Sequence, residues 1–275
     1  MNRSPGRRMV SSAADAVKRL FAGPKPVAPA RVPDGCVVYA VGDIHGRDDL
    51  LQQILGAIRE DAQNLSEHAT AVFLGDYVDR GPDSRAVIDR LIEASDDDTI
   101  QWRFLRGNHD QTVLDFLRNP MTGMAWSDYG GRDTMESYGV PPPPPWADSE
   151  TWRLAAADFA AAMPLEHLNF FEELEPSCEI GDYFFVHAGV RPGVPLDRQS
   201  ARDLLWIREP FLSDTASLPK VVVHGHTVTP QVHADERRIG IDTGAYASGV
   251  LTALRLCGDE GAIIQTGTGD TQKFA

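Results

Sequence analysis

Apolar and polar positions in the first part of the chain follow two alternating spacings. Short apolar runs rich in β-branched residues, at 37–41, 71–74 and 100–105, predict buried strands. Between them, 49–58 and 84–94 repeat apolar residues every three or four positions, which predicts amphipathic helices. This order of strands and helices favours a parallel sheet with right-handed crossovers.

The alternation is interrupted after about residue 110. Residues 111–172 contain helical pieces, tryptophans and the run Pro141–Pro145, so they predict a mostly helical insertion with a stiff polyproline connection. Few long helices separate the later strand-like runs, which lie at 183–186, 221–223, 237–241, 250–256 and 261–265. These runs predict a mixed or antiparallel sheet. The expected fold is α/β, with two sheets packed face to face and helices outside.

The N-terminal segment differs from the rest in composition. Residues 1–33 are rich in Pro, Gly, Ser and Arg and predict a flexible basic tail, while 34–275 form the predicted folded domain. Within the tail, 12–21 has helical spacing with two basic residues beside it, which would suit a short surface-seeking helix. A disordered linker is the alternative. Weak contact of the tail with an anionic membrane is one hypothesis for its purpose.

Charge is distributed unevenly along the chain. The formal net charge is −14, and residues 1–31 hold seven Lys or Arg and one Asp, a net of +6, which leaves −20 on the remainder. A body this acidic disfavours nucleic-acid binding, and it needs local positive charge to capture an anionic substrate. No apolar run approaches the roughly 20 residues that span a bilayer, so we expect no stable membrane insertion.

Three widely spaced cysteines argue against a disulfide framework and favour a reducing compartment. We therefore expect a cytoplasmic protein. Cys36 and Cys257 lie beside predicted buried strands, and they are expected to be small core residues.

Acidic residues, histidine and glycines follow the first two predicted strands. Gly42–Gly46 (GDIHG) places Asp43 and His45 two residues apart, so that in an extended segment both can face one metal ion. Gly75–Gly81 (GDYVDRG) brings Asp76 33 residues after Asp43, about the length of one βαβ unit. Asp76 should thus lie beside Asp43, where its two oxygens could bridge two cations.

The second and third motifs add groups that can act on a substrate. Asp79 and Arg80 lie within the same turn as the bridging carboxylate. Arg106–Asp110 (RGNHD) comes one further βαβ unit along, and the side-chain carbonyl of Asn108 is a neutral oxygen ligand. His109 follows directly and could donate a proton to a leaving group.

Two later strands also end in histidine motifs. His187–Gly189 (HAG) follows 183–186, and His224–Thr227 (HGHT) follows 221–223. A lone histidine at a strand end is usually a structural residue whose polar atoms are hydrogen-bonded within the fold. Five such motifs in succession are hard to explain by packing, because ligands bind at the carboxyl ends of strands in open α/β sheets.

The ordered set GDIHG, GDYVDRG, RGNHD, HAG and HGHT resembles the calcineurin-like metallophosphoesterases. More narrowly, it is similar to the PPP-type serine/threonine protein phosphatases of the bacterial, lambda phosphatase-like group. The segments 204–209 (LLWIRE) and 241–245 (IDTGA) also resemble that group. The resemblance covers about residues 36–256. It implies a four-layer α/β/β/α sandwich of two mixed sheets, and it implies nothing about the tail.

Carried over to the matching positions, the resemblance implies a centre for two divalent metal ions. Its ligands would be Asp43, His45, Asp76, Asn108, His187 and His226. The first three would serve one ion and the last three the other, with Asp76 bridging both. His109 would be the general acid, oriented and kept protonated by Asp79. Three guanidinium groups would hold the phosphate oxygens, those of Arg80, Arg106 and Arg208.

The implied activity is that of a metal-dependent phosphomonoesterase acting on phosphorylated proteins. Two ions would activate a hydroxide for direct in-line attack, and three guanidiniums would offset the phosphate charge. Asp, Asn and His ligands suit manganese, iron or zinc, with Mn²⁺ favoured. A symmetrical dinucleoside tetraphosphatase, or another small-molecule phosphohydrolase, is the alternative. Such relatives tend to lose the Asp of the VDRG segment. A catalytically inactive scaffold is disfavoured because the ligand set is intact.

Other polar residues near the motifs are expected to be less important. Asp110 replaces the Glu usual after Asn-His in eukaryotic members, with a modest expected effect. His224 is expected to be structural, and a ligand or phosphate contact is its alternative. Three histidines without a motif are expected at the surface: His68, His167 and His233. The insertion tryptophans are expected in a core rather than in a substrate platform.

Overall fold

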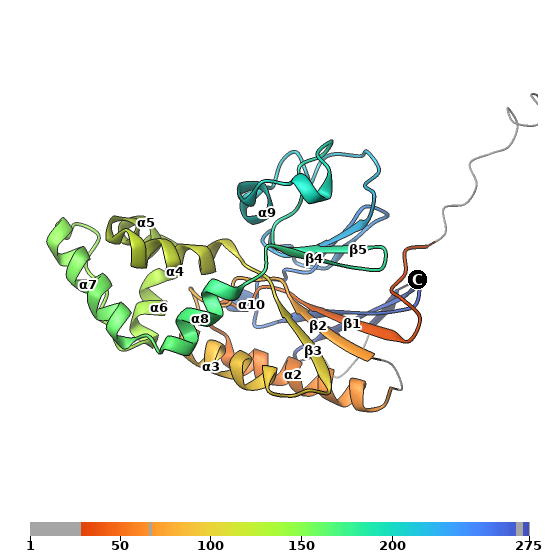
Figure 1. Ribbon diagram of the computed structural model, residues 1–275, viewed down its shortest axis with the longest axis horizontal. Helices are drawn as coiled ribbons and strands as arrows, with labels where there is room; N and C mark the ends of the chain where they lie inside the picture. Colours follow the sequence, from red (N-terminus) through yellow and green to blue (C-terminus); the bar gives the residue numbers. More distant parts are fainter. Residues whose placement is uncertain (1–28, 66–67, 268–271, 275) are drawn as a thin grey trace, which may run out of the picture.

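The computed structural model describes residues 29–65, 68–267 and 272–274, and its first elements follow the predicted order (Figure 1). The strands β1 (Cys36–Val41), β2 (His68–Phe73) and β3 (Ile100–Phe104) are parallel, with β2 between the other two. They are connected by α2 (Asp48–Gln63) and α3 (Ser84–Ser95), whose buried residues recur at helical spacing. The βαβαβ unit expected from the sequence is confirmed.

Three C-terminal strands complete the first sheet, whose order is β11-β10-β9-β1-β2-β3. β9 (Thr252–Cys257), β10 (Glu260–Gln265) and β11 (Gln272–Phe274) are antiparallel to their neighbours. The sequence had grouped the runs at 250–256 and 261–265 with the second sheet, and the structure corrects this. β2 pairs with one edge of β1. The backbone donors and acceptors on the other edge of β1 pair with β9.

The second sheet has the order β4-β5-β6-β8-β7 and is mixed. Parallel neighbours are β5 (Tyr183–Val186), β6 (Val221–His224) and β8 (Arg238–Gly240). Antiparallel strands flank them, namely β4 (Ser177–Ile180) and β7 (His233–Ala234). The sequence did not predict these two, because they are short and carry polar residues where an apolar run would be expected.

Each face of the first sheet has its own core. Val37 and Tyr39 of β1 pack in the cluster that includes residues of α2 and α3, whereas Val38 and Ala40 pack between the two sheets, in the same cluster as Val223 of β6. Burial on both faces explains why β1 is a continuous apolar run. Figure 1 shows α2 and α3 outside the first sheet and α9 (Ala201–Trp206) outside the second. The four-layer α/β/β/α sandwich is confirmed.

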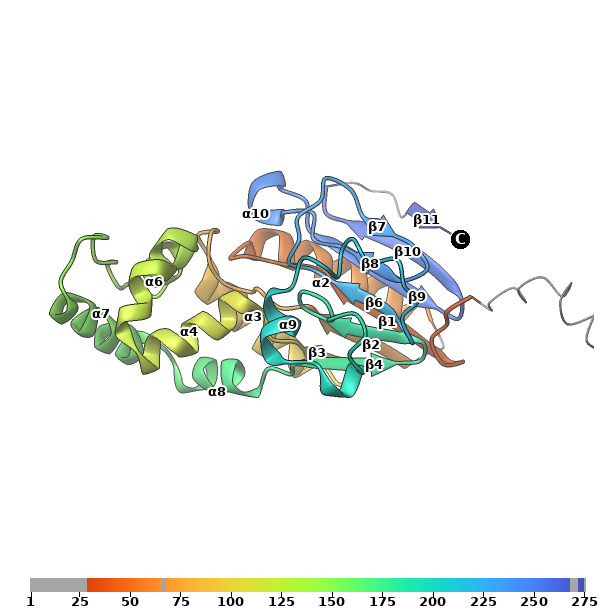
Figure 2. The same cartoon turned by 90° about the horizontal axis from the view of Figure 1, so that it is seen from above.

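The predicted insertion is helical and projects from one end of the sandwich (Figure 2). Its α-helices are α4 (Asn108–Arg118), α5 (Gly123–Trp126), α6 (Arg132–Ser137), α7 (Ser149–Ala162) and α8 (Leu165–Glu173). A short 3-10 helix at Pro120–Thr122 and a π-helix at Ser127–Gly131 link α4 to α6. α4 starts at Asn108, so the third motif itself begins the insertion.

The tryptophans of the insertion differ in burial. Trp126 and Trp152 lie in an aromatic core with Phe116 and Phe159, as expected. Trp146 is 84% exposed, beside the Pro141–Pro145 run, which contradicts the expectation for this residue. A single sequence does not separate the three, because their neighbours in the core come from helices far apart in the chain.

His167 was expected at the surface, and this prediction was wrong. Its side chain is fully buried, with Nδ1 2.8 Å from the hydroxyl of Tyr138 and Nε2 2.8 Å from Oδ1 of Asp89. Tyr138 is the C-cap residue of α6 and Asp89 lies on α3, 29 and 78 residues away, so no local motif could show these partners. Of the other two histidines, His68 is exposed and His233 is half-buried.

The end of the predicted tail packs against the domain. Val32 is buried, and its N–H donates to the carbonyl of Gly258 at 3.0 Å. The possible helix at 12–21 lies outside the described residues, and so does most of the basic charge. Within the residues that the structure describes, no helix has the length and apolarity needed to cross a membrane.

Candidate active site

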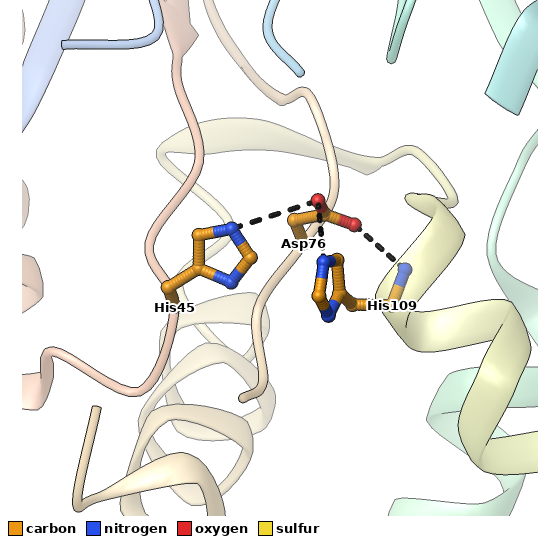
Figure 3. A group of neighbouring side chains, drawn as sticks. All are labelled: His45, Asp76 and His109. Carbon is orange, nitrogen blue, oxygen red and sulfur yellow. Dashed lines mark hydrogen bonds and ion pairs between the residues drawn. The ribbon is translucent and has the colours of Figure 1, made fainter. Parts of the chain in front are cut away.

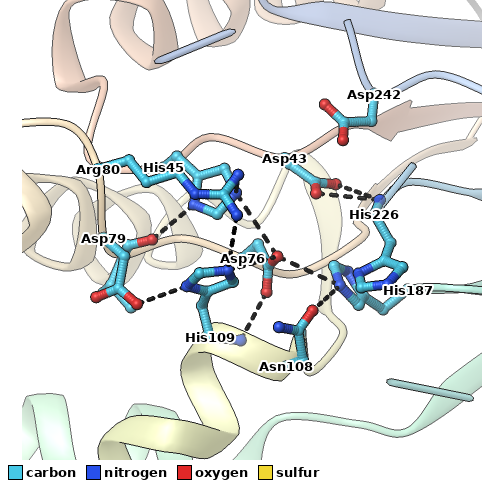
Figure 4. A network of polar contacts seen from close by, with 12 residues as sticks. Asp43, His45, Asp76, Asp79, Arg80, Asn108, His109, His187, His226 and Asp242 are labelled. Atoms are coloured by element: carbon cyan, nitrogen blue, oxygen red, sulfur yellow. Dashed lines mark hydrogen bonds and ion pairs between the residues drawn. The ribbon is translucent and has the colours of Figure 1, made fainter. Parts of the chain in front are cut away.

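Five strand ends bring the sequence-predicted ligands to one place (Figure 4). β1, β2 and β3 end before Asp43, Asp76 and Asn108, β5 ends before His187, and β6 ends just before His226. All these side chains are buried. Because the five strands are parallel to a neighbour in one or the other sheet, their carboxyl ends meet at one edge of the sandwich.

Asp76 lies at the centre of this cluster. Its Oδ2 is 3.7 Å from Nε2 of His45 and 3.3 Å from Nε2 of His187. Nε2 of His109 lies 4.0 Å from the same oxygen, and Figure 3 shows how His45 and His109 flank the carboxylate. Two groups of side chains whose geometry could hold a metal ion share Asp76: one with His45 and His109, the other with His187 and His226.

Backbone carbonyls fix which ring nitrogen of each histidine faces the cluster. Nδ1 of His45 donates to the carbonyl of Val78 at 2.8 Å, and Nδ1 of His187 donates to that of Leu74 at 2.9 Å. Each Nε2 therefore points its lone pair inward, as a metal-ligating imidazole requires. Burial lowers the pKa of His45 to about 3, which keeps the ring neutral.

Several acceptor atoms converge without enough donors between them. Nε2 of His226 is buried and has no hydrogen-bond partner among the described residues, and burial lowers the pKa of this ring to about 2. Nε2 of His187 lies only 2.9 Å from Oδ1 of Asn108. Burial opposes a charge on this ring, but the Asp76 carboxylate outweighs it and raises the pKa of His187, which shows how strongly the cluster favours a positive charge here. A buried lone pair facing other acceptors is costly unless a cation lies between them. The donor set therefore fits divalent metal ions.

Two neighbouring carboxylates strengthen this argument. Asp43 accepts the backbone N–H of His226 at 3.1 Å, and Asp242 faces it from the loop after β8 (Figure 4). Burial, followed by the charges of Asp242 and Asp76, raises the pKa of Asp43. A bound cation would reverse this effect. The segment 241–245 pointed to the family, but sequence analysis missed Asp242 as a member of the site.

His109 and Asp79 form a buried pair beside the candidate metal ligands. Nδ1 of His109 donates to Oδ2 of Asp79 at 2.6 Å, and Asp79 is fully buried. Burial opposes the charged imidazolium, but the Asp76 and Asp79 carboxylates outweigh it, and the pKa of His109 lies above its usual value. The pairing expected from the sequence is thus present.

The three arginines that the sequence assigned to phosphate binding lie in different surroundings. Arg80 donates to Nε2 of both His45 and His109 at 3.1 Å, and its guanidinium lies 4.6 Å from the ring centre of Tyr246. Arg208 is exposed, with Nη2 3.5 Å from the carbonyl of His226.

Arg106 contacts the insertion. Its Nη2 donates to the carbonyls of Phe171 and Glu172 at the end of α8, and its Nη1 donates to Gln111. Arg80 and Arg208 thus contact residues of the histidine cluster, while the hydrogen bonds of Arg106 are with the insertion. The sequence could not show this, because α8 lies more than 60 residues further along.

Backbone strain is concentrated in the site. Within the described part of the chain, every non-glycine residue with a left-handed backbone belongs to the predicted motifs: His45, Asp76, Asp79, Arg80 and His226. Their φ angles lie between 48° and 75°. Such conformations cost energy for residues with a Cβ, and they persist where surrounding contacts fix them. Strain of this kind is typical of functional sites.

Two polar residues support the ligands from outside. Nδ1 of His224 donates to the carbonyl of Gly225, and Nε2 lies 3.2 Å from Nη1 of Arg238, so the ring is engaged on both sides. This contact set favours the structural role. Asp110, for which the sequence predicted a modest effect, accepts backbone N–H groups of Gly107, Asp76 and Tyr77.

Comparisons with known proteins agree with this geometry. A family model of calcineurin-like phosphoesterases matches residues 37–255. Serine/threonine-protein phosphatase 1 of Salmonella typhimurium is 29% identical over 225 residues, which cover 80% of this chain and 91% of that protein. A symmetrical bis(5'-nucleosyl)-tetraphosphatase of Paracidovorax citrulli is also 29% identical, over 227 residues that cover 82% of this chain and 68% of that protein.

Solved structures show the same fold at low sequence identity. A provisionally assigned diadenosine tetraphosphatase aligns with a TM-score of 0.59 and 21% identity, covering 89% of this chain and 100% of that one. A cold-active protein-tyrosine phosphatase of a psychrophilic Shewanella aligns with a TM-score of 0.55 and 16% identity, covering 89% and 83%.

Proposed function

The chain belongs to the calcineurin-like phosphoesterase family, and we propose that this metallophosphoesterase is a PPP-type serine/threonine protein phosphatase. The hydrogen bond between His109 and Asp79 carries the proposal. The oxygen released from phosphoserine or phosphothreonine is a poor leaving group, so it needs a proton as its bond to phosphorus breaks. A nucleotide released from a dinucleoside polyphosphate is already a stable anion and needs this proton less.

The family's dinuclear metal centre would be held by the six residues that converge at the strand ends, with Asp76 shared. When bound, two divalent ions would activate the attacking water and offset the charge of the phosphate in its in-line displacement. Mn²⁺ is our choice for both ions, with iron or zinc as alternatives, because the donors are carboxylate, amide and imidazole.

The residues around the centre have separate tasks in this proposal. Nε2 of the protonated His109 ring delivers a proton to the departing serine or threonine oxygen, and Asp79 stabilises that imidazolium. A protonated Nε2 has no free lone pair, so its hydrogen bond from Arg80 is lost in this state. Arg80 and Arg208 bind phosphate oxygens, since both border the histidine cluster. Arg106 is the third guanidinium of this proposal; its Nη2 is engaged by α8, while its buried Nε has no partner among the described residues.

Arg80 must move when a cation binds to His45. One guanidinium nitrogen donates to the Nε2 lone pair that we assign to the metal. A lone pair cannot serve a proton donor and a cation at once, so this hydrogen bond is lost on metal binding. The Tyr246 ring lies 4.6 Å from the guanidinium and can hold it by a cation–π contact near the site of the phosphate.

One feature favours the second candidate, a dinucleoside polyphosphate hydrolase. A cavity of about 410 Å³ lies beside Arg208 and is also lined by Arg202 and Trp206. The Trp206 side chain is 50% exposed, with its ring 6.3 Å from that of the candidate ligand His226. An exposed aromatic ring with arginines beside it could bind a nucleobase and further phosphates.

A comparison of substrates decides between the two candidates. The purified full-length protein, loaded with Mn²⁺, is assayed with phosphoserine and phosphothreonine peptides and with diadenosine tetraphosphate. We expect the higher kcat/KM for phosphopeptides. A kcat/KM far higher for the dinucleotide, with a rise in its KM in Trp206→Ala, would overturn this proposal in favour of the second candidate.

Phosphorylated proteins would then be the partners, in a cytoplasmic setting. Support for the location comes from the cysteines: Cys36, Cys178 and Cys257 are all free thiols, and Cys178 is buried in the core between the sheets. Nucleic acid is not proposed as a partner, because the charge outside the N-terminal segment is strongly negative.

A further inference from the structure

The Asp79 carboxylate receives hydrogen bonds from the insertion as well as from His109. Its Oδ2 accepts Nε1 of Trp126 at 2.8 Å in addition to Nδ1 of His109 at 2.6 Å. Its Oδ1 accepts the hydroxyl of Thr134 at 2.6 Å, and the same hydroxyl oxygen accepts the N–H of Asp79 at 2.9 Å. Both oxygens of this fully buried group are therefore fixed in direction.

The insertion also contacts the backbone of the turn on which Asp79 lies. The carbonyl of Gly130, within the π-helix, accepts the N–H of Arg80 at 3.3 Å. Gly130 has φ of 108°, and a Cβ there would lie 2.5 Å from the backbone nitrogen of Arg80. The two chain segments thus approach as closely as a residue without a side chain allows. Asp79 and Arg80 both have left-handed backbones, and these contacts help to hold them so.

The positions of the two donors are themselves fixed by packing. Trp126 is 2% exposed, with its ring 5.0 Å from that of Phe116 and 5.7 Å from that of Phe159. Thr134 is buried on α6, against Ser84 at the start of α3. Neither donor can swing away without disturbing the insertion core, so the direction of the Asp79 carboxylate depends on how the insertion folds.

We propose that Trp126 and Thr134 are positioning residues, which aim the Asp79 carboxylate at Nδ1 of His109 and so make protonation of the leaving group depend on the insertion. Trp126 occupies one side of Oδ2 and leaves the other for His109, while Thr134 prevents the carboxylate from rotating. The inference rests on the proposed role of His109 as the general acid. It gives the insertion a part in the chemical step, beyond any contact with the substrate.

Substrates with different leaving groups test the proposal in the full-length, Mn²⁺-loaded protein. Phenyl phosphate releases a poor leaving group, which needs a proton, whereas 2,4-dinitrophenyl phosphate releases a good one, which does not. We expect Trp126→Phe and Thr134→Val each to lower kcat for phenyl phosphate about tenfold, and to change kcat for the dinitrophenyl ester by less than about twofold. Metal content and KM should stay close to those of the wild type.

Matched variants separate positioning from general stability. Trp152 lies in the same aromatic core, is fully buried, and its Nε1 has no hydrogen-bond partner among the described residues. Trp152→Phe therefore removes the same atoms as Trp126→Phe without removing a bond to Asp79. It should change kcat for both esters equally. Thr134→Ser keeps the hydroxyl and should restore the activity that Thr134→Val loses.

A second measurement does not depend on turnover. In the metal-free protein, the Nδ1 proton of His109 should give a downfield proton NMR signal, identified by its loss in His109→Asn. This signal should move in Trp126→Phe and stay in place in Trp152→Phe. If Trp126→Phe and Thr134→Val change both esters equally and leave the signal unmoved, the positioning role is wrong.

The His109→Asn variant distinguishes failure of this inference from failure of the proposed function. It should show the same selective loss as Trp126→Phe, but a larger one. A selective loss in His109→Asn without one in Trp126→Phe or Thr134→Val would reject the positioning role and keep the general acid. An equal loss for both esters in His109→Asn would reject the general acid itself.

Discussion

Asp110 holds the backbone of Asp76 in place. Its Oδ2 accepts the N–H of Asp76 at 2.8 Å, and its Oδ1 accepts that of Tyr77 at 3.0 Å. Asp76 has a φ of 54°, which is unfavourable for a residue with a Cβ. The carboxylate that follows the predicted general acid thus stabilises the strained loop that presents Asp76, the proposed bridging ligand.

Asp110→Asn should weaken metal binding. The amide keeps one acceptor oxygen but turns an NH₂ group toward backbone donors, so the loop of Asp76 loses support. Removing a residue that supports a metal ligand typically lowers metal affinity by about 10–100-fold. We therefore expect the affinity for Mn²⁺, measured by isothermal titration calorimetry, to fall by about tenfold or more. Asp115→Asn, on the same helix and facing Gln111, is the control and should bind Mn²⁺ like the wild type.

Replacing His226 should lower the metal content of the protein, whereas replacing His224 should leave it unchanged. His226→Asn removes the buried Nε2 that has no partner within the described residues, and it should lower the metal content of the dialysed protein from about two ions per chain to about one. His224→Asn should keep about two, because both ring nitrogens of His224 already have hydrogen-bond partners. A loss of metal in His224→Asn would show that this residue is a ligand after all.

Acid should destabilise the metal-free protein partly through His224. Burial lowers the pKa of His224 to about 4, so the unfolded chain binds its proton more readily than the folded one. This contribution to the free energy of unfolding is complete above about pH 6.5, the usual histidine value, and is lost as the pH falls toward 4.

The measurement for this effect is urea unfolding in a chelating buffer at several pH values. Between about pH 6 and pH 4.5, the free energy of unfolding should fall less steeply in His224→Gln than in the wild type, by up to about 1.4 kcal/mol per pH unit. Equal slopes for the two proteins would mean that His224 is protonated in the fold.

Gly225→Ala should displace the proposed metal ligand Asp43. A Cβ at Gly225 would lie 2.0 Å from Oδ1 of Asp43, so the carboxylate must move away from the N–H of His226. We expect Mn²⁺ affinity to fall by about tenfold or more. The control is Gly56→Ala on the exposed face of α2, where a Cβ meets no atom of the described residues within 4 Å. It should raise the melting temperature, since alanine favours helix by about 1 kcal/mol.

The sequence by itself determined which residues form the candidate site and the order in which the chain supplies them. Asp43, Asp76 and Asn108 follow strands at βαβ spacing, and parallel strands bring their carboxyl ends together wherever that spacing recurs. The spacing of apolar residues also predicted the parallel strands β1, β2 and β3 and the helices that connect them. These features are local, so periodicity and motif spacing show them.

Only the tertiary structure decided what supports those residues. Trp126 and Thr134 reach Asp79 across 47 and 55 residues, Asp242 reaches Asp43 from the other sheet, and His167 is buried by partners on two other helices. Arg106 likewise donates to two carbonyls of α8, which lie far from it along the chain. The physical reason is the same in each case. A buried polar group is satisfied by donors and acceptors that lie close to it in space, whereas a sequence pattern shows only how far apart residues lie along the chain.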